Sequence, residues 1–85
     1  MSPKPSTIKA CLKDAQRSLK RAGSETARLD AEILLAHVLE NGRIFLHLEP
    51  GFELSDKQLS HFQTLVKRRE NHEPVAYILG EQEFW

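Results

Sequence analysis

The alternation of apolar and polar positions predicts an all-α protein, a small bundle of four to five helices. After a polar, proline-containing lead (residues 1–5), which we expect to be disordered, apolar residues recur every three or four positions and so lie on one face of a helix. Ser6 or Thr7 can cap this helix and Gly23 can end it. Its apolar face comprises Ile8, Leu12, Ala15, Leu19 and Ala22.

A second helix is predicted to start between Ser24 and Thr26 and to end at Asn41-Gly42. Its apolar residues extend well beyond a single stripe. A helix that is apolar most of the way round is normally surrounded by other helices. We therefore expect this helix at the centre of the fold, with three nearly fully buried side chains: Leu34, Leu35 and Val38.

The short segment 43–48 is too brief for its periodicity to distinguish helix from strand. We expect a short helix capped by Asn41, followed by a turn at Glu49-Pro50-Gly51. The next helix has the clearest start, because Ser55 and Gln58 have the spacing of a capping box. Leu54 and Leu59 occupy the positions of a hydrophobic staple around this start.

This fourth helix should carry its apolar face to Val66 and end at Asn71-His72. A last short helix is predicted to begin with Pro74 at its first position, where the missing amide costs nothing, and to close at Gly80. From Glu81 the polar and aromatic residues alternate, which is typical of a β-strand. We expect residues 81–85 to open a β-hairpin linker to a further domain that would complete the burial of Phe84 and Trp85.

Composition limits the function classes. Twelve cationic and twelve anionic residues balance over the 85-residue chain, so no global field indicates nucleic acid or membrane as a partner. The single cysteine, Cys11, excludes an internal disulfide, and no apolar run is long enough for a membrane span. We expect a soluble, cytoplasmic domain.

The sequence predicts no catalytic, cofactor-binding or metal-binding residues. The four histidines lack the short spacings of a zinc site, and Cys11 has no adjacent base and fits the edge of the core. The glycines are isolated and each stands at a predicted helix end, so a phosphate-cradling loop is not expected. We predict that this segment binds no cofactor and performs no chemistry by itself.

A cationic stripe lies opposite the apolar face of the first helix and consists of Lys9, Lys13, Arg17 and Lys20. It fits a solvated face, a contact with a protein or ribonucleoprotein, or, least well, DNA binding. The run Lys67-Arg68-Arg69 falls in the last turn of a predicted helix, where interaction with the helix dipole is a sufficient explanation.

Several segments, in their order and spacing, resemble the N-terminal domain of the HemK/PrmC family of methyltransferases. They cover about Ala10 to Trp85 and are the runs Arg28–Val38, Gly42-Arg43, Leu65–Arg69, Arg68–Pro74 and Tyr77–Gly80. One departure is His72, because the family usually has glycine before Glu-Pro.

The resemblance implies a parent enzyme that uses S-adenosylmethionine to modify the glutamine of the Gly-Gly-Gln loop in peptide-chain release factors, a function in translation termination. The cofactor and the Asn-Pro-Pro-Tyr motif would belong to a catalytic domain after Trp85. Residues 6–80 would be the helical domain that recognises the release factor, with the parent's own catalytic domain as a second partner.

Partner-binding residues are predicted among the cations: Arg28, Arg43, Lys9, Lys13, Arg17 and Lys20. Charged surface groups tune association more than they stabilise a small fold. Two other classes remain open, a free-standing helical adaptor without a catalytic partner and, more weakly, a small nucleic-acid-binding domain.

Overall fold

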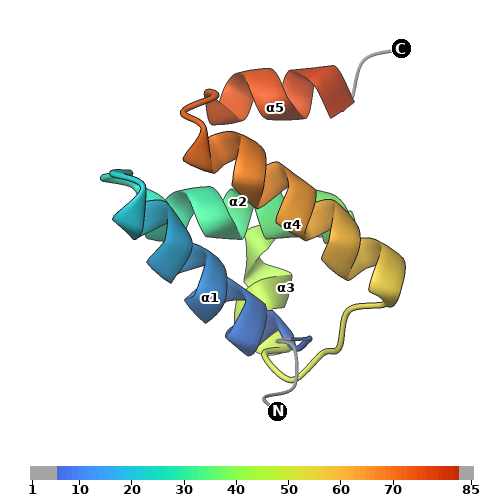
Figure 1. Cartoon of the computed structure of the whole chain (residues 1–85). Coiled ribbons are helices and arrows are strands. Elements are labelled where there is room, and N and C mark those ends of the chain that lie inside the picture. Colours follow the sequence, from blue (N-terminus) through green and yellow to red (C-terminus); the bar gives the residue numbers. More distant parts are fainter. Residues whose placement is uncertain (1–5, 83–85) are drawn as a thin grey trace.

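Five α-helices make up the fold (Figure 1). The computed structural model describes residues 6–82 of the backbone and 6–80 of the side chains. The helices are α1 (Ile8–Arg21), α2 (Ala27–Leu39), α3 (Arg43–Leu48), α4 (Asp56–Glu70) and α5 (Val75–Gln82). The predicted all-α bundle is confirmed, and the lead 1–5 lies outside the described residues.

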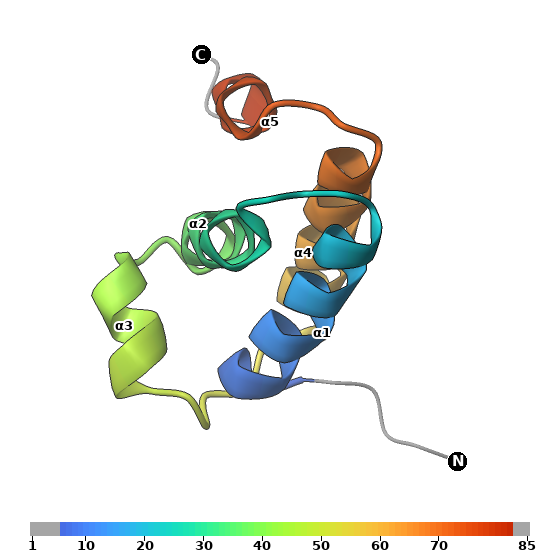
Figure 2. The ribbon, with the colours of Figure 1, turned by 90° about the vertical axis from the view of Figure 1, so that its left-hand side faces the viewer.

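Helix α2 is the centre of the bundle, because it packs against each of the other four helices. Figure 2 looks nearly along α2, with α3 on one side, α1 and α4 on the other, and α5 above. Leu34 and Leu35 are fully buried and Val38 is 8% exposed. The predicted burial of these three residues on a helix that is apolar on several sides is therefore confirmed.

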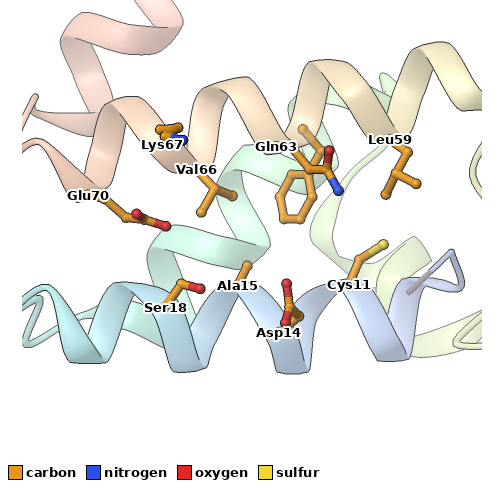
Figure 3. Close-up of a pocket in the computed structure, with 10 residues that line it drawn as sticks. Cys11, Asp14, Ala15, Ser18, Leu59, Gln63, Val66, Lys67 and Glu70 are labelled. Carbon is orange, nitrogen blue, oxygen red and sulfur yellow. The ribbon is translucent and has the colours of Figure 1, made fainter. Parts of the chain in front are cut away.

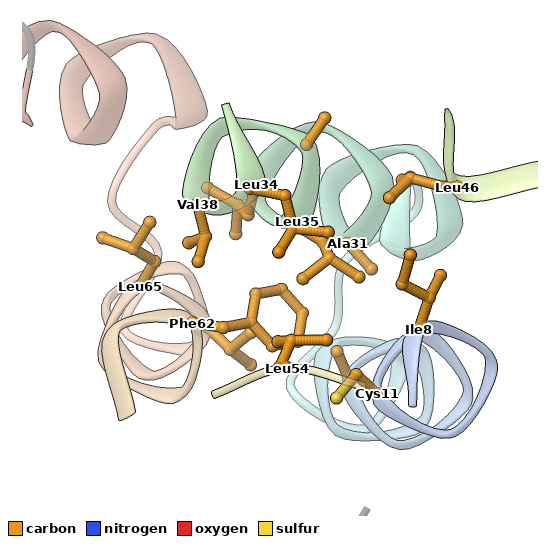
Figure 4. Close-up of a cluster of buried hydrophobic side chains, with 14 of the residues drawn as sticks. Ile8, Cys11, Ala31, Leu34, Leu35, Val38, Leu46, Leu54, Phe62 and Leu65 are labelled. Atoms are coloured by element: carbon orange, nitrogen blue, oxygen red, sulfur yellow. The ribbon is translucent and has the colours of Figure 1, made fainter. Parts of the chain in front are cut away.

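The core is one continuous cluster between α2 and the pair α1 and α4 (Figure 4). Ile8 and Cys11 of α1 and Phe62 and Leu65 of α4 point towards α2, while Leu46 brings α3 into the same cluster. Cys11 is only 2% exposed, deeper than the core edge that the sequence predicts.

Two predicted helix starts are confirmed at atomic detail. The Thr7 hydroxyl accepts a hydrogen bond from the amide of Ala10 at 3.2 Å, which satisfies one free donor of α1. At α4, Ser55 accepts from the Gln58 amide and the Gln58 side chain accepts from the Ser55 amide, completing the capping box.

A connection between distant segments was not predicted. The chain between α3 and α4 runs antiparallel to the entry into α1, with an isolated bridge between Thr7 and Glu53. The amide of Ile8 donates to the carbonyl of Phe52, and the amide of Leu54 donates to that of Ser6. These bonds hold the loop after α3 against the first turn of α1.

Three predictions at helix ends are wrong. Gly42, not Asn41, precedes the first residue of α3, and the Asn41 side chain instead donates to the carbonyl of Leu39. Pro74 stands just before α5 and supplies the carbonyl that the Ile78 amide bonds. Gly80 does not close α5, which continues through it to Gln82.

The expected strand from Glu81 is not confirmed. Glu81 and Gln82 are helical, because the hydrogen-bonded turns of α5 extend past Gly80. Residues 83–85, where the rest of that strand was predicted, lie outside the described part of the chain. Among the helices of residues 6–82, none combines the length and apolar character that a bilayer crossing demands.

Candidate partner-binding surface

Two carboxylates lie buried on α2, two residues apart in sequence. Asp30 is 5% exposed and Glu32 is 4% exposed. Asp30 accepts hydrogen bonds from the hydroxyls of Ser24 at 2.8 Å and Thr26 at 3.0 Å, and from Arg69 Nε at 3.0 Å. A buried charge is tolerable when it is paired and hydrogen-bonded in this way, so Asp30 joins the start of α2 to the end of α4.

The same network reaches the loop that leads into α5. Arg69 also donates to the carbonyl of Glu73 at 3.2 Å, and Arg68 pairs with the Glu73 carboxylate at 2.7 Å. The hydrogen bond from Arg68 holds the pKa of the Glu73 carboxyl below its ordinary value. The Arg68 guanidinium also lies 6.0 Å from the ring centroid of Tyr77, at the outer range of a cation–π contact. Arg68 and Arg69 therefore have tertiary partners, beyond the helix dipole that the sequence indicated.

Glu32 faces the other way, towards α3. Arg43 Nη2 lies 3.1 Å from its Oε1, Arg28 Nε lies 3.4 Å from its Oε2, and His47 Nε2 lies 3.7 Å from Oε1. Burial alone would raise the pKa of the Glu32 carboxyl. Hydrogen bonds from Arg43 and Arg28, aided by nearby His47, outweigh burial and hold this pKa below its ordinary value.

The basic side chains around Glu32 remain open to solvent. The side chain of Glu32 is 6% exposed, whereas those of Arg28, Arg43 and His47 are 73%, 51% and 54% exposed. One carboxylate thus orients two permanent cations and a titratable histidine while leaving their outer faces accessible. A surface of this kind attracts and orients an anionic partner.

Two shallow grooves meet at Glu32. The first, of about 330 Å³, lies between α1, α2 and α3 and has Lys9 and Lys13 on its α1 side. The second, of about 380 Å³, lies between the start of α2 and α3 and is bordered by Arg28 and Arg43. Among the residues that line them we call four cations, Glu32 and His47 the Glu32 surface: Lys9, Lys13, Arg28, Glu32, Arg43 and His47. Glu25 also lines the second groove.

Four of the six predicted partner-binding residues come together on this surface. They are Lys9, Lys13, Arg28 and Arg43. Arg17 and Lys20 are exposed on α1 but line neither groove. The sequence analysis did not predict Glu32 or His47 as part of this surface. For Glu32 a signal was present, because it is a charged residue within a helix that is apolar on most sides.

A third hollow separates α1 from α4 (Figure 3). Its base includes Ala15 and Val66, and polar side chains of both helices border it, among them Asp14 and Lys67. At about 150 Å³ it is smaller than the several hundred Å³ of typical ligand pockets. Burial, reinforced by Asp14, raises the pKa of the adjoining Cys11 thiol to about 11. This thiol is therefore protonated at neutral pH, which suits a packing role.

The structure brings two of the four histidines together and places a third beside Glu32. His37 and His61 meet edge to face with ring centroids 6.4 Å apart, and His47 borders Glu32. Within the described residues, no group of three histidine, cysteine, aspartate or glutamate side chains is arranged to hold a metal ion.

Comparison with known proteins agrees with the resemblance noted in the sequence. The family model described as the PrmC N-terminal domain matches residues 10–80. A release factor glutamine methyltransferase from Vibrio cholerae is 46% identical over 79 residues, 93% of this chain and 28% of that protein. Its namesake from Escherichia coli is 44% identical over 62 residues, 73% of this chain and 22% of that protein.

The chain thus spans between about a fifth and a third of the length of these relatives. No solved structure matches it. The match to the family model nevertheless covers most of the chain and all five helices except the first two residues of α1 and the last two of α5. The chain therefore belongs to the PrmC N-terminal domain family.

Proposed function

We propose that this chain is the substrate-docking domain of an S-adenosylmethionine-dependent methyltransferase that modifies the glutamine of the Gly-Gly-Gln loop in peptide-chain release factors. The observation that carries the proposal is the match to relatives named release factor glutamine methyltransferase, over 93% of this chain but 28% of the Vibrio cholerae protein. Residues 6–80 form the docking domain and 81–85 begin the linker to the catalytic part of a cytoplasmic enzyme.

Docking through a separate domain has a physical reason. One glutamine on an exposed loop looks much like any other, so contacts at the reacting atom alone cannot select it. Contacts remote from the reacting centre supply binding energy that orients the loop. The exposed cations of the Glu32 surface are available for such contacts with an acidic part of a protein substrate.

The described residues do not fit S-adenosylmethionine. Folds that bind nucleoside-containing cofactors commonly use a glycine-rich turn and, after it, a free carboxylate that holds the ribose. Here the glycines stand apart along the chain. The two buried carboxylates, Asp30 and Glu32, are already paired with arginines. We assign cofactor binding and methyl transfer to the remainder of the parent protein.

Kinetics of the parent enzyme test the docking role. Removing residues 1–80 should lower kcat/KM for the intact release factor roughly a hundredfold if docking contributes about 3 kcal/mol. Activity on a short Gly-Gly-Gln peptide, which cannot reach the docking surface, should persist. This peptide activity also controls for folding of the truncated enzyme.

Equal losses on peptide and intact factor would make the domain a stabiliser of the catalytic fold instead. The reading frame after Trp85 gives a simpler check. A methyltransferase fold with Asn-Pro-Pro-Tyr supports the proposal, whereas an immediate stop codon would favour a free-standing adaptor.

A further inference from the structure

The outward face of α3 is apolar. Ile44 and Leu48 are separated by one helical turn and are 73% and 69% exposed. On the opposite side of α3, Leu46 is 2% exposed and enters the core, while Phe45 packs against the core's edge. Residues four apart share one helix face, so Ile44 and Leu48 form a two-residue apolar patch directed away from the protein.

This patch adjoins the Glu32 surface. Arg43 and His47, also one turn apart on α3, both lie within 4 Å of Glu32, on the side of α3 that faces α2. Because Glu32 holds the Arg43 guanidinium through two nitrogens, at 3.2 and 3.1 Å, that cation is oriented before any partner arrives. Preorganised groups lose less freedom on binding.

The continuation of the chain is a poor candidate to cover this patch. Helix α3 packs mainly on α2, and α5, from which the chain leaves, packs on α2 and α4. Figures 1 and 2 both show α3 and α5 on different sides of α2. A segment that follows Gln82 would have to pass around α2 to reach Ile44 and Leu48.

The charges around Ile44 and Leu48 indicate which kind of partner could cover them. Lys9, Lys13, Arg28 and Arg43 line the grooves on the α2 side of α3, and the two acidic residues that line them, Glu25 and Glu32, balance only two of these charges. Apolar anchors bordered by cations suit a protein segment that combines exposed apolar side chains with acidic neighbours.

We infer that Ile44 and Leu48 of α3 are the apolar anchors by which this domain holds its protein substrate, and that Arg43 and the neighbouring cations receive acidic residues beside the anchored segment. The inference rests on the proposed docking function and adds to it the surface and the chemistry of the partner. The segment contacted lies on the intact release factor, outside the Gly-Gly-Gln loop.

The parent enzyme with the double substitution Ile44→Ser and Leu48→Ser tests the inference. We expect kcat/KM for the intact release factor to fall about tenfold or more, through a higher KM, since buried anchors dominate interface energies. Activity on the Gly-Gly-Gln peptide and the urea midpoint should be unchanged, because both side chains are exposed in the free protein. Tyr77→Ser, which alters another large exposed side chain, 60% exposed and on α5, is the matched control and should leave KM unchanged.

Salt dependence tests the acidic character of the partner. Raising ionic strength should lower kcat/KM for the intact factor, and Lys9→Gln with Lys13→Gln should flatten that dependence. A dependence unchanged by these two substitutions would overturn the assignment of acidic neighbours.

The two proposals fail in different ways. If deletion of the domain selectively harms activity on the intact factor but the Ile44/Leu48 variant does not, docking stands and this surface is wrong. If deletion harms peptide and intact factor equally, the docking function itself fails. A concentration-dependent dimer that the double substitution dissociates would make the patch a self-association surface and would also overturn the inference.

Discussion

The two buried carboxylates of α2 are close in sequence but have opposite surroundings. Asp30 is enclosed by two hydroxyls and by Arg69, whose side chain is 21% exposed. Glu32 is equally buried, yet its partners Arg28 and Arg43 are 73% and 51% exposed. The enclosed network around Asp30 fixes helices to one another. The open network around Glu32 leaves its arginines exposed to solvent. One helix thus supports the fold with one face and a candidate binding surface with the next.

Leu35→Ala should have the largest effect, because it leaves a cavity beside the helix that carries both carboxylates. The side chain is fully buried on α2, so lost burial and the resulting cavity should cost about 2–5 kcal/mol in the free energy of unfolding. Urea melts measure this cost. A loss below about 1 kcal/mol would contradict the central position of α2.

Asp30→Asn should break the enclosed network. The substitution keeps the shape but removes the charge that Arg69 and the two hydroxyls satisfy, and we expect a cost of about 2–3 kcal/mol. Arg69 is then left beside a neutral amide, so amide hydrogen exchange near the start of α5 should also accelerate. A silent substitution would mean that the network does not hold α2, α4 and α5 together.

Glu32→Gln should cost less, about 1.5 kcal/mol at neutral pH, because its arginine partners can turn to water. The folded pKa of Glu32 is depressed, so its contribution is fully present above the unfolded value of about 4.3 and is lost as pH falls towards the folded pKa. The stability difference between wild type and Glu32→Gln should therefore shrink in urea melts below about pH 4.3.

A difference that grew on acidification would contradict the depressed pKa of Glu32. In the parent enzyme, Glu32→Gln should also raise KM for the intact factor, because Arg28 and Arg43 lose their orientation. Asp30→Asn, matched in chemistry, should act on stability rather than on KM.

Ser55→Ala is the smallest of these changes and serves as a reference away from both carboxylates. It leaves one amide of α4 without its cap, at a cost of about 1 kcal/mol. Because the hydrogen bonds of Ser55 within the described residues stay in the first turn of α4, to Gln58 and Leu59, its effect should add to that of Asp30→Asn or Glu32→Gln. Strong non-additivity in double-mutant melts would show that the α4 start is coupled to one network.

Local signals account for what the sequence predicted well. The all-round apolar character of α2 indicated its burial, and the Ser55 and Gln58 spacing located the start of α4, since both depend on neighbours within a few residues. The predicted end of α5 at Gly80 is wrong, because a glycine can also remain inside a helix at some cost.

The candidate surface was only partly predictable for the opposite reason. Arg28 and Arg43 were selected as exposed cations, but Glu32 meets Arg43 across eleven residues of sequence. Asp30 meets Arg69 across thirty-nine residues. No local sequence pattern predicts such pairings, because they form only when α3 and α4 pack on α2. The exposure of Ile44 and Leu48 likewise depends on which side of α3 faces the core.

His72, at the corner between α4 and α5, adopts a left-handed conformation with φ of 70°. The family resemblance implies glycine at this place, and a side chain in this region costs on the order of 1 kcal/mol. The bend itself is therefore encoded by the surrounding contacts, including the Arg68–Glu73 pair, and tolerates an ill-suited residue. For protein engineering, His72→Gly would remove the steric cost of this conformation without touching either buried carboxylate.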